Sequence, residues 1–380
     1  MSFSSTRASI RAAIVGIAIL GTPLALSATA HAAPTDGITV TNPTPAEQNA
    51  WRGITFGNGT FVAVAQSGTN RVMTSTDGIT WTARAAANAN SWTSVAYGNN
   101  LFVAVTETGT NRVMTSTDGI TWTARSADSG DWRSVAYGNG KFVALAYTGN
   151  KSMTSTDGVT WTVTSLNTGN DWNSMTFGNG VFVAISTTGT NRVLTSTDGV
   201  TWTARAAAEQ NDWSAIAYGN NLFVAVAGTG TNRVMTSPDG TTWTARAAAA
   251  SQAWKVVGAG GGYFLALSFD GTEHAMISTD GANWSMLNGA GSANWESAAY
   301  GNGAFVGISN VGPIYVVRAS TPTTTTTVAA TTTVAPTTTE AAASSGETTP
   351  STGTNTDLAL AAMALVMGGA IVLSRRRLVD

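Results

Sequence analysis

The side chains that could bind a ligand occur in repeated sets. An Asn-Arg pair ends the same loop in four places, and an Asp stands directly before a Trp in three places. Amide, guanidinium and carboxylate groups supply the hydrogen-bond donors and acceptors that a polar ligand needs. The candidate binding residues are Asn70, Arg71, Asn111, Arg112, Asn191, Arg192, Asn232, Arg233, Asp131, Asp171 and Asp212.

Catalytic chemistry has much weaker support in the sequence. Beyond the N-terminal region there is one His, His274, and it follows Glu273; the pair is either a general acid and base or two ordinary loop residues at the rim. There is no phosphate-binding loop, zinc signature or catalytic-triad motif, and the chain has no Cys. We therefore expect no catalytic residue, no metal and no cofactor.

Charge and composition exclude one class of partner. Only 11% of the 380 residues are charged, and the net charge is −2. The body of the chain has no run of basic residues, so it lacks the positive charge needed to bind the phosphate backbone of a nucleic acid. We expect no nucleic-acid partner. Stability must come from packing, because disulfides are excluded.

The elements that must position the candidate residues repeat every 40 or 41 residues. Each repeat begins with a Trp and holds four short runs rich in Val, Phe, Thr and Tyr, bounded by Gly and Asn. Four antiparallel strands per repeat of about 40 residues are typical of a β-propeller blade. The repeats begin at Trp51, Trp92, Trp132, Trp172, Trp213, Trp254 and Trp295.

The seventh repeat lacks a fourth strand before the composition changes. Residues 36–41 align with residues 77–82, the fourth-strand region of the first repeat. An N-terminal strand that completes the last blade would remove an open sheet edge. The sequence thus predicts an all-β, seven-bladed propeller of four-stranded antiparallel blades over residues 34–320.

Turn residues predict how each blade is connected. Gly-Asn-Gly or Gly-Asn-Asn joins the first strand to the second, and Asp-Gly joins the third to the fourth. We expect Asp-Gly to form a two-residue type I′ turn, with the six later Trp residues inside the fourth strands. These two turns share one face of the disc. The longer loops, which carry the candidate binding residues, share the other face, where we expect binding.

The segment Ser75-Thr76-Asp77-Gly78-Ile79-Thr80-Trp81 and its five later variants resemble the Asp-box, or BNR, repeat of sialidases and related propellers. The family pattern has a residue between Asp and Gly that this chain lacks. The resemblance implies a turn remote from any active centre, and it keeps a sialidase-like glycoside hydrolase as an alternative function. The structural Asp residues would be Asp77, Asp118, Asp157, Asp198, Asp239 and Asp280.

The two ends of the chain look like export and anchoring signals. Residues 1–32 have the basic, apolar and small-residue order of a secretory signal peptide. Residues 321–349 form a stalk rich in Thr, Ala and Pro, which composition predicts to be disordered. Residues 349–380 resemble an LPxTG sorting signal, with Thr349 in place of Leu, cleavage between Thr352 and Gly353, an apolar segment at 358–373 and a basic tail.

Together these features predict a non-catalytic adhesion protein on the surface of a Gram-positive type of cell. It would be anchored to peptidoglycan or held in the membrane by its C-terminus. Nearly identical blades would offer several equivalent weak sites for a glycan or protein ligand. The alternatives are the hydrolase named above and a structural surface protein without a specific ligand.

Overall fold

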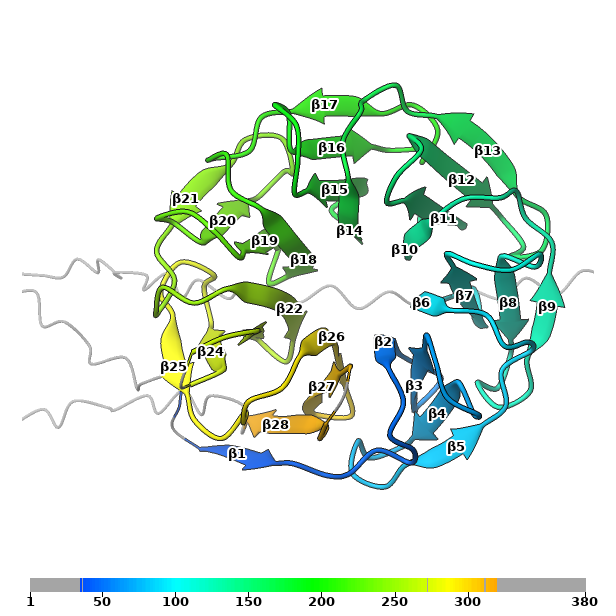
Figure 1. The fold of residues 1–380 in the computed structure, drawn as a ribbon. Helices are drawn as coiled ribbons and strands as arrows, with labels where there is room; N and C mark the ends of the chain where they lie inside the picture. The colour runs from blue at the N-terminus through cyan, green and yellow to red at the C-terminus, as the bar shows by residue number, and fades with distance from the viewer. Residues whose placement is uncertain (1–34, 36, 272, 311, 320–380) are drawn as a thin grey trace, which may run out of the picture. The chain divides into compact units, whose positions relative to one another are not determined.

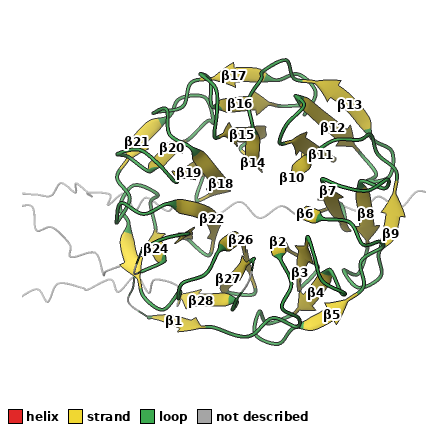
Figure 2. Ribbon diagram, in the orientation of Figure 1, coloured by secondary structure: helices red, strands yellow, loops and turns green. Residues whose placement is uncertain are grey.

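The computed structural model describes residues 35, 37–271, 273–310 and 312–319. These residues form seven four-stranded antiparallel sheets arranged around one axis (Figure 1). Strands and loops make up the whole of this part, without a helix (Figure 2). The predicted seven-bladed propeller is confirmed.

Six blades run outward from the axis in chain order, and the outer strand of the seventh comes from the N-terminal end of the propeller. The innermost strands are β2 (Trp51–Gly57), β6 (Trp92–Gly98), β10 (Trp132–Gly138), β14 (Trp172–Gly178), β18 (Trp213–Gly219), β22 (Trp254–Gly260) and β26 (Trp295–Gly301). The second strands are β3 (Thr60–Ala65), β7 (Leu101–Thr106), β11 (Lys141–Ala146), β15 (Val181–Ser186), β19 (Leu222–Ala227), β23 (Tyr263–Ser268) and β27 (Ala304–Ser309). The third strands are β4 (Val72–Ser75), β8 (Val113–Ser116), β12 (Lys151–Ser155), β16 (Val193–Ser196), β20 (Val234–Ser237), β24 (Ala275–Ser278) and β28 (Tyr315–Ala319). The outer strands are β5 (Thr82–Arg84), β9 (Thr123–Arg125), β13 (Thr162–Ser165), β17 (Thr203–Arg205), β21 (Thr244–Arg246), β25 (Ser285–Leu287) and β1 (Ile38–Thr41).

The N-terminal strand closes the ring. In the seventh blade β1 lies beside β28, with Ile38 opposite Ala319 and Thr41 opposite Val316, so the sheet order is β1-β28-β27-β26 (Figure 1). Val40 packs against the core between the sixth and seventh blades. The predicted exchange between the two ends of the propeller is confirmed.

The blades pack through one repeated pair, an aromatic ring against a glycine. A Cβ added to Gly98 would lie 2.0 Å from Cγ of Tyr137 in the next blade. The same relation links Gly301 of the seventh blade to Phe56 of the first, so the seam resembles the other junctions. Between the fifth and sixth blades the partner of Gly219 is Ala259 instead of an aromatic residue. Glycine is required here for close approach rather than for its backbone angles.

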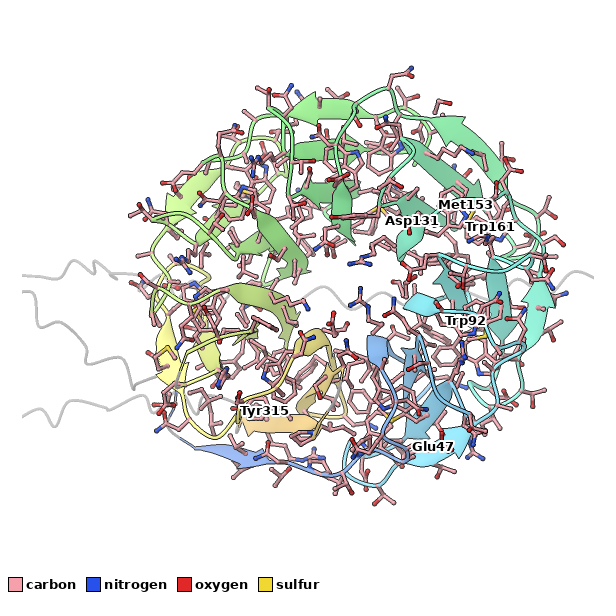
Figure 3. The ribbon with its side chains drawn as sticks, in the orientation of Figure 1. Glu47, Trp92, Asp131, Met153, Trp161 and Tyr315 are labelled. Atoms are coloured by element: carbon pink, nitrogen blue, oxygen red, sulfur yellow. The ribbon has the colours of Figure 1, made fainter. Side chains whose placement is uncertain are left out.

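The first-strand Trp residues are fully buried between blades. Trp92 is 0% exposed, and its Nε1 donates a hydrogen bond to the backbone oxygen of Asn88 at 3.2 Å (Figure 3). The second strands are buried along their length, as in Phe102–Val105. Neighbouring blades cover both faces of each sheet, which explains the continuous apolar runs.

The turn assignment made from the sequence is wrong in one place. Type I′ geometry occurs between the first two strands, where Asn58 and Gly59 have φ of 47° and 74°. Between β4 and β5, residues 76–81 form a longer loop, and only Gly78 of the Asp-Gly pair is recorded with positive φ. Trp81 therefore ends that loop rather than lying in β5. The Asp side chain accounts for the difference, because it binds the backbone of this longer turn.

These Asp residues act as acceptors inside their own turns. Oδ1 of Asp157 accepts hydrogen bonds from the backbone N–H groups of Val159 and Thr160, both at 2.8 Å, and from the Ser155 hydroxyl. The hydrogen bond from Thr160 contributes most to lowering the pKa of Asp157 to about 2. Five other turns show the same pattern, at Asp77, Asp118, Asp198, Asp239 and Asp280.

These turns predict a loss of stability in acid. A carboxyl whose pKa is lowered on folding stabilises the fold above its unfolded pKa of about 3.9, and that contribution is lost as the pH falls towards the folded value. We expect the melting temperature to fall between about pH 4 and pH 2. The Asp157→Asn variant should melt lower than the parent at neutral pH and converge with it in acid. Because the carboxyl is exposed, its effect at neutral pH should be under about 1 kcal/mol. If the melting temperatures of the parent and the variant differ by the same amount at every pH in this range, the assignment is wrong.

The predicted signal peptide, stalk and sorting signal lie outside the described residues, as do Thr352 and Gly353. Asp36, aligned with the turn Asp residues, is also outside them. Among the residues that the structure does describe, no helix has the length and apolar character for crossing a membrane.

Candidate functional site

Every blade has a β-bulge at the start of its innermost strand. In the first blade Trp51 is opposite Ala65 and Gly53 is opposite Val64, so Arg52 is an extra residue without a partner in the ladder. The same shift follows the first Trp of the other six blades. A bulge changes the direction of a side chain and is common beside binding sites.

The bulge residues line a cavity on the propeller axis. They form a set that we call the bulge ring: Arg52, Thr93, Arg133, Asn173, Ser214, Lys255 and Glu296. The cavity has a volume of about 250 Å³. Its lining also includes the buried apolar residues Ile54, Val95 and Ile216. Nitrogen-bearing side chains point into the centre of the disc (Figure 3).

The bulge ring carries three cations and one anion. Glu296 joins two of the cations, with 2.8 Å from its carboxylate to Arg52 and 2.8 Å to Lys255. The Glu296 side chain is only 4% exposed. Lys255 also donates to Oδ1 of Asn294 at 2.9 Å. This cluster ties the sixth, seventh and first blades together and leaves one ring cation outside it.

That remaining cation is Arg133. Its nearest carboxylate oxygen, on Glu107, is 3.7 Å away, and its guanidinium lies 5.0 Å from the centre of the Tyr147 ring. Burial lowers the pKa of Arg133, and the positive charge of Arg52 lowers it further. Two like charges therefore face one cavity, a favourable arrangement for binding an anion.

The ring opens on the face predicted to bind. Tyr147 directly follows β11, and Glu107 directly follows β7, so both begin second-to-third-strand loops. On the opposite face Nδ2 of Asn302 donates to the backbone oxygens of Gly59 and Thr76, which joins the first-to-second turn and the third-to-fourth connection of the first blade to the seventh blade. The division of turns and loops between the faces agrees with the sequence interpretation.

The predicted loop arginines are engaged with backbone oxygens. Arg71 donates to Gln66 of its own blade and to Ala89 and Asn90 of the next connection, at 2.7–3.0 Å. Similar contacts hold Arg112, Arg192 and Arg233. These side chains fasten loops to one another, which leaves fewer donors for a ligand.

The predicted Asn and Asp residues lie around the same loops and do not converge. Asn70 donates to Glu47 at 2.5 Å, and Asn232 donates to Glu209 in the same way. The Asn111 side chain accepts from Ser126 at 3.5 Å, and the backbone oxygen of Asn191 accepts from Asn170 at 2.5 Å. Asp131 accepts from Thr148, Asp212 pairs with Arg192 at 3.1 Å, and the Asp171 N–H donates to Thr188 (Asp131 and Glu47 in Figure 3).

His274 is buried rather than exposed on the rim. It is 4% exposed, lies just before β24 and is not part of the cavity lining. Its neighbour Glu273 raises the pKa of Tyr315, although burial of that Tyr has the larger effect. Among the described residues, no group of three or more His, Asp or Glu side chains is placed to hold a metal ion.

The bulge ring was not recognised from the sequence, although a signal was present. The residue after the first-strand Trp differs in almost every repeat, while the residues further along the first two strands hardly change. A position that varies among otherwise similar repeats is a candidate for a function that differs from blade to blade. Only the bulge, which the sequence pattern did not reveal, brings these residues together at the axis.

Comparisons with known proteins agree with the fold. The model of a family described as the DUF6242 beta propeller domain matches residues 84–213, which begin at the end of β5 and extend to the start of β18. A search of curated proteins gave no match.

Solved propellers resemble this chain in shape at low sequence identity. Virginiamycin B lyase from Staphylococcus aureus has a TM-score of 0.65 and 13% identity, covering 74% of this chain and 99% of the lyase. YCF48 from Cyanidioschyzon merolae has a TM-score of 0.58 and 16% identity, covering 73% and 98%. The WD40 propeller of Doa1 has a TM-score of 0.55 and 10% identity, covering 74% and 96%. At these identities the likeness concerns the fold alone.

Proposed function

We propose that this protein is a secreted, surface-anchored and non-catalytic propeller that binds a glycan in its axial cavity. The observation that carries the proposal is the bulge ring. Seven side chains of six types, one from each of seven similar blades, converge on one cavity. A single asymmetric site then takes the place of the several equivalent loop sites suggested by the repeats.

The size and lining of the cavity favour a sugar over a protein segment. Pockets for drug-sized ligands are typically about 300–1,000 Å³, so a cavity of about 250 Å³ suits one small group. Asn173 and Ser214 contribute to its wall. Nδ2 of Asn173 donates to the Ser214 backbone oxygen at 2.6 Å and the Ser214 hydroxyl donates to that of Asp212 at 3.2 Å, so their side-chain oxygens are left as acceptors for sugar hydroxyls. At the rim Phe269 is 56% exposed beside Lys255, and an aromatic face of this kind suits stacking with a sugar ring.

The proposed cellular location rests on the sequence of the two ends. The signal-like segment 1–32 directs export, and the sorting-like segment 349–380 retains the protein at the wall or membrane. The stalk at 321–349 then carries the propeller away from the surface. Protease treatment of intact cells, followed by an immunoblot, should remove the propeller if this placement is correct.

A glycan array with the 34–320 fragment tests the binding proposal. We expect a signal that falls about tenfold when Asn173→Ala and Ser214→Ala are combined, because two neutral hydrogen bonds contribute about 0.5–1.5 kcal/mol each. The matched pair Asn111→Ala and Arg112→Ala changes the outer loops and should leave the signal unchanged.

Two results would contradict this assignment. Loss of signal only with the loop pair would restore the multivalent loop face as the binding site. Release of a fluorogenic sugar by the fragment would favour the hydrolase, and complete silence in both assays would favour the structural role.

A further inference from the structure

The Arg133 side chain lacks partners for its donors. Its side chain is 26% exposed, and within the described residues its guanidinium makes one ion pair, with Glu107, whose 3.7 Å separation is too long for a hydrogen bond. A guanidinium has five N–H donors, and a mostly buried one is normally paired with acceptors. Its contacts are the Tyr147 ring and the distant oxygen of Glu107.

We propose that Arg133 is an oxyanion subsite and that the axial cavity selects acidic glycans. This inference rests on the proposed function and defines its ligand further. The guanidinium edge would pair with a carboxylate, sulfate or phosphate group on the sugar, since two parallel N–H groups match two oxygens of such a group.

The charges around the subsite support an anionic occupant. Arg52 and Lys255 are held by Glu296, so the four charged members of the bulge ring sum to +2. Glu107 lies on the other side of Arg133 and lowers that sum to +1. An anion between Arg133 and Arg52 would relieve the repulsion between these two cations.

The cavity wall indicates that a sugar carries the anion. Free inorganic ions need only the charge, whereas the cavity also provides Asn173 and Ser214 in its wall. A sugar acid uses both features, so it should bind more tightly than the free ion.

Titration with simple sugars tests the subsite. Glucuronate, glucose 6-phosphate and a sulfated galactose would be compared with galactose by ligand-detected NMR at low salt, because salt screens exposed charges. We expect at least one acidic sugar to bind and the neutral sugar not to bind. Arg133→Gln should weaken that binding at least about tenfold, since a charge-assisted hydrogen bond contributes about 1.5–3 kcal/mol.

Two variants separate binding from folding. Lys141→Gln removes one positive charge from β11 outside the cavity lining and should change neither binding nor stability. Arg133→Gln should melt close to the parent, because the repulsion with Arg52 that it removes offsets the long ion pair with Glu107 and the contact with the Tyr147 ring that it loses. A lower melting temperature together with weaker binding would assign Arg133 a structural role and overturn the proposal.

The remaining outcomes distinguish this inference from the proposed function. An array signal confined to neutral glycans would overturn the acidic preference and keep the binding function. Equal binding of inorganic phosphate or sulfate and the sugar acids would overturn the sugar part of the subsite. Silence in the array and in every titration would overturn both.

Discussion

Removal of residues 34–45 should cause aggregation or a loss of roughly 10 °C or more in melting temperature. The deletion removes β1, which fills the outer position of the seventh blade. It exposes the edge of β28 and uncovers the apolar contact made by Val40. We expect the free energy of unfolding to fall by several kcal/mol. Each kcal/mol lowers the melting temperature by about 2–4 °C in a large domain. Calorimetry and light scattering would measure the two effects.

A pair of single substitutions provides the control for this deletion. Val40 faces the core and Thr39 faces solvent, as the alternating burial of β1 shows. Val40→Asp should therefore lower stability markedly, whereas Thr39→Asp should have little effect. If the deleted protein melts like the full propeller, β1 does not close the ring in solution.

The fold was predictable because the same blade pattern occurs seven times in the sequence. A Trp every 40 or 41 residues, four runs per repeat and Gly-Asn turns all indicate the same blade. The alignment of residues 36–41 with residues 77–82 also located the closing strand. Agreement among such independent local signals is what lets a sequence specify one structure.

The Asp-Gly turn was not predictable by the same reasoning. Asp-Gly between two apolar runs favours a two-residue hairpin, but side-chain hydrogen bonds favoured the longer turn here. The Ser75 hydroxyl accepts from the Gly78 N–H at 2.8 Å, and Asp77 accepts from two further N–H groups. These interactions depend on three-dimensional geometry that composition does not reveal.

The binding residues predicted from the sequence lie in loops on the face where the bulge ring opens, but they do not line the axial cavity. Sequence reasoning selected residues that offer donors, such as Arg71, without knowledge of their acceptors. The structure gives those donors backbone partners within the protein. The sequence pattern does not single out Arg133, because this residue follows a Trp inside a predicted strand, where a regular ladder would pair it. The bulge between Trp132 and Ser134 is the feature that changes its environment.

A methyl group at Gly98 should destabilise the propeller by about 3 kcal/mol, near the upper end of overpacking effects. In Gly98→Ala the new Cβ would lie 2.0 Å from Cγ and 2.6 Å from Cβ of Tyr137. These atoms are close to the Tyr137 backbone, so rotation of the ring cannot relieve the contact and the two blades must separate. Chemical denaturation of the parent and variant would measure the loss.

A double-mutant cycle identifies the Tyr137 ring as the cause. Tyr137→Ala alone should destabilise by leaving a gap, yet combined with Gly98→Ala it should recover part of the stability, because the ring no longer occupies the space. Gly219→Ala is the matched control, since its neighbour is already Ala259 and its closest approach is 2.7 Å. It should lower the free energy of unfolding by less than Gly98→Ala does. The aromatic ring does not set the spacing between blades if the losses of unfolding free energy from Gly98→Ala and Tyr137→Ala are additive. The same conclusion follows if Gly98→Ala and Gly219→Ala lower the free energy of unfolding equally.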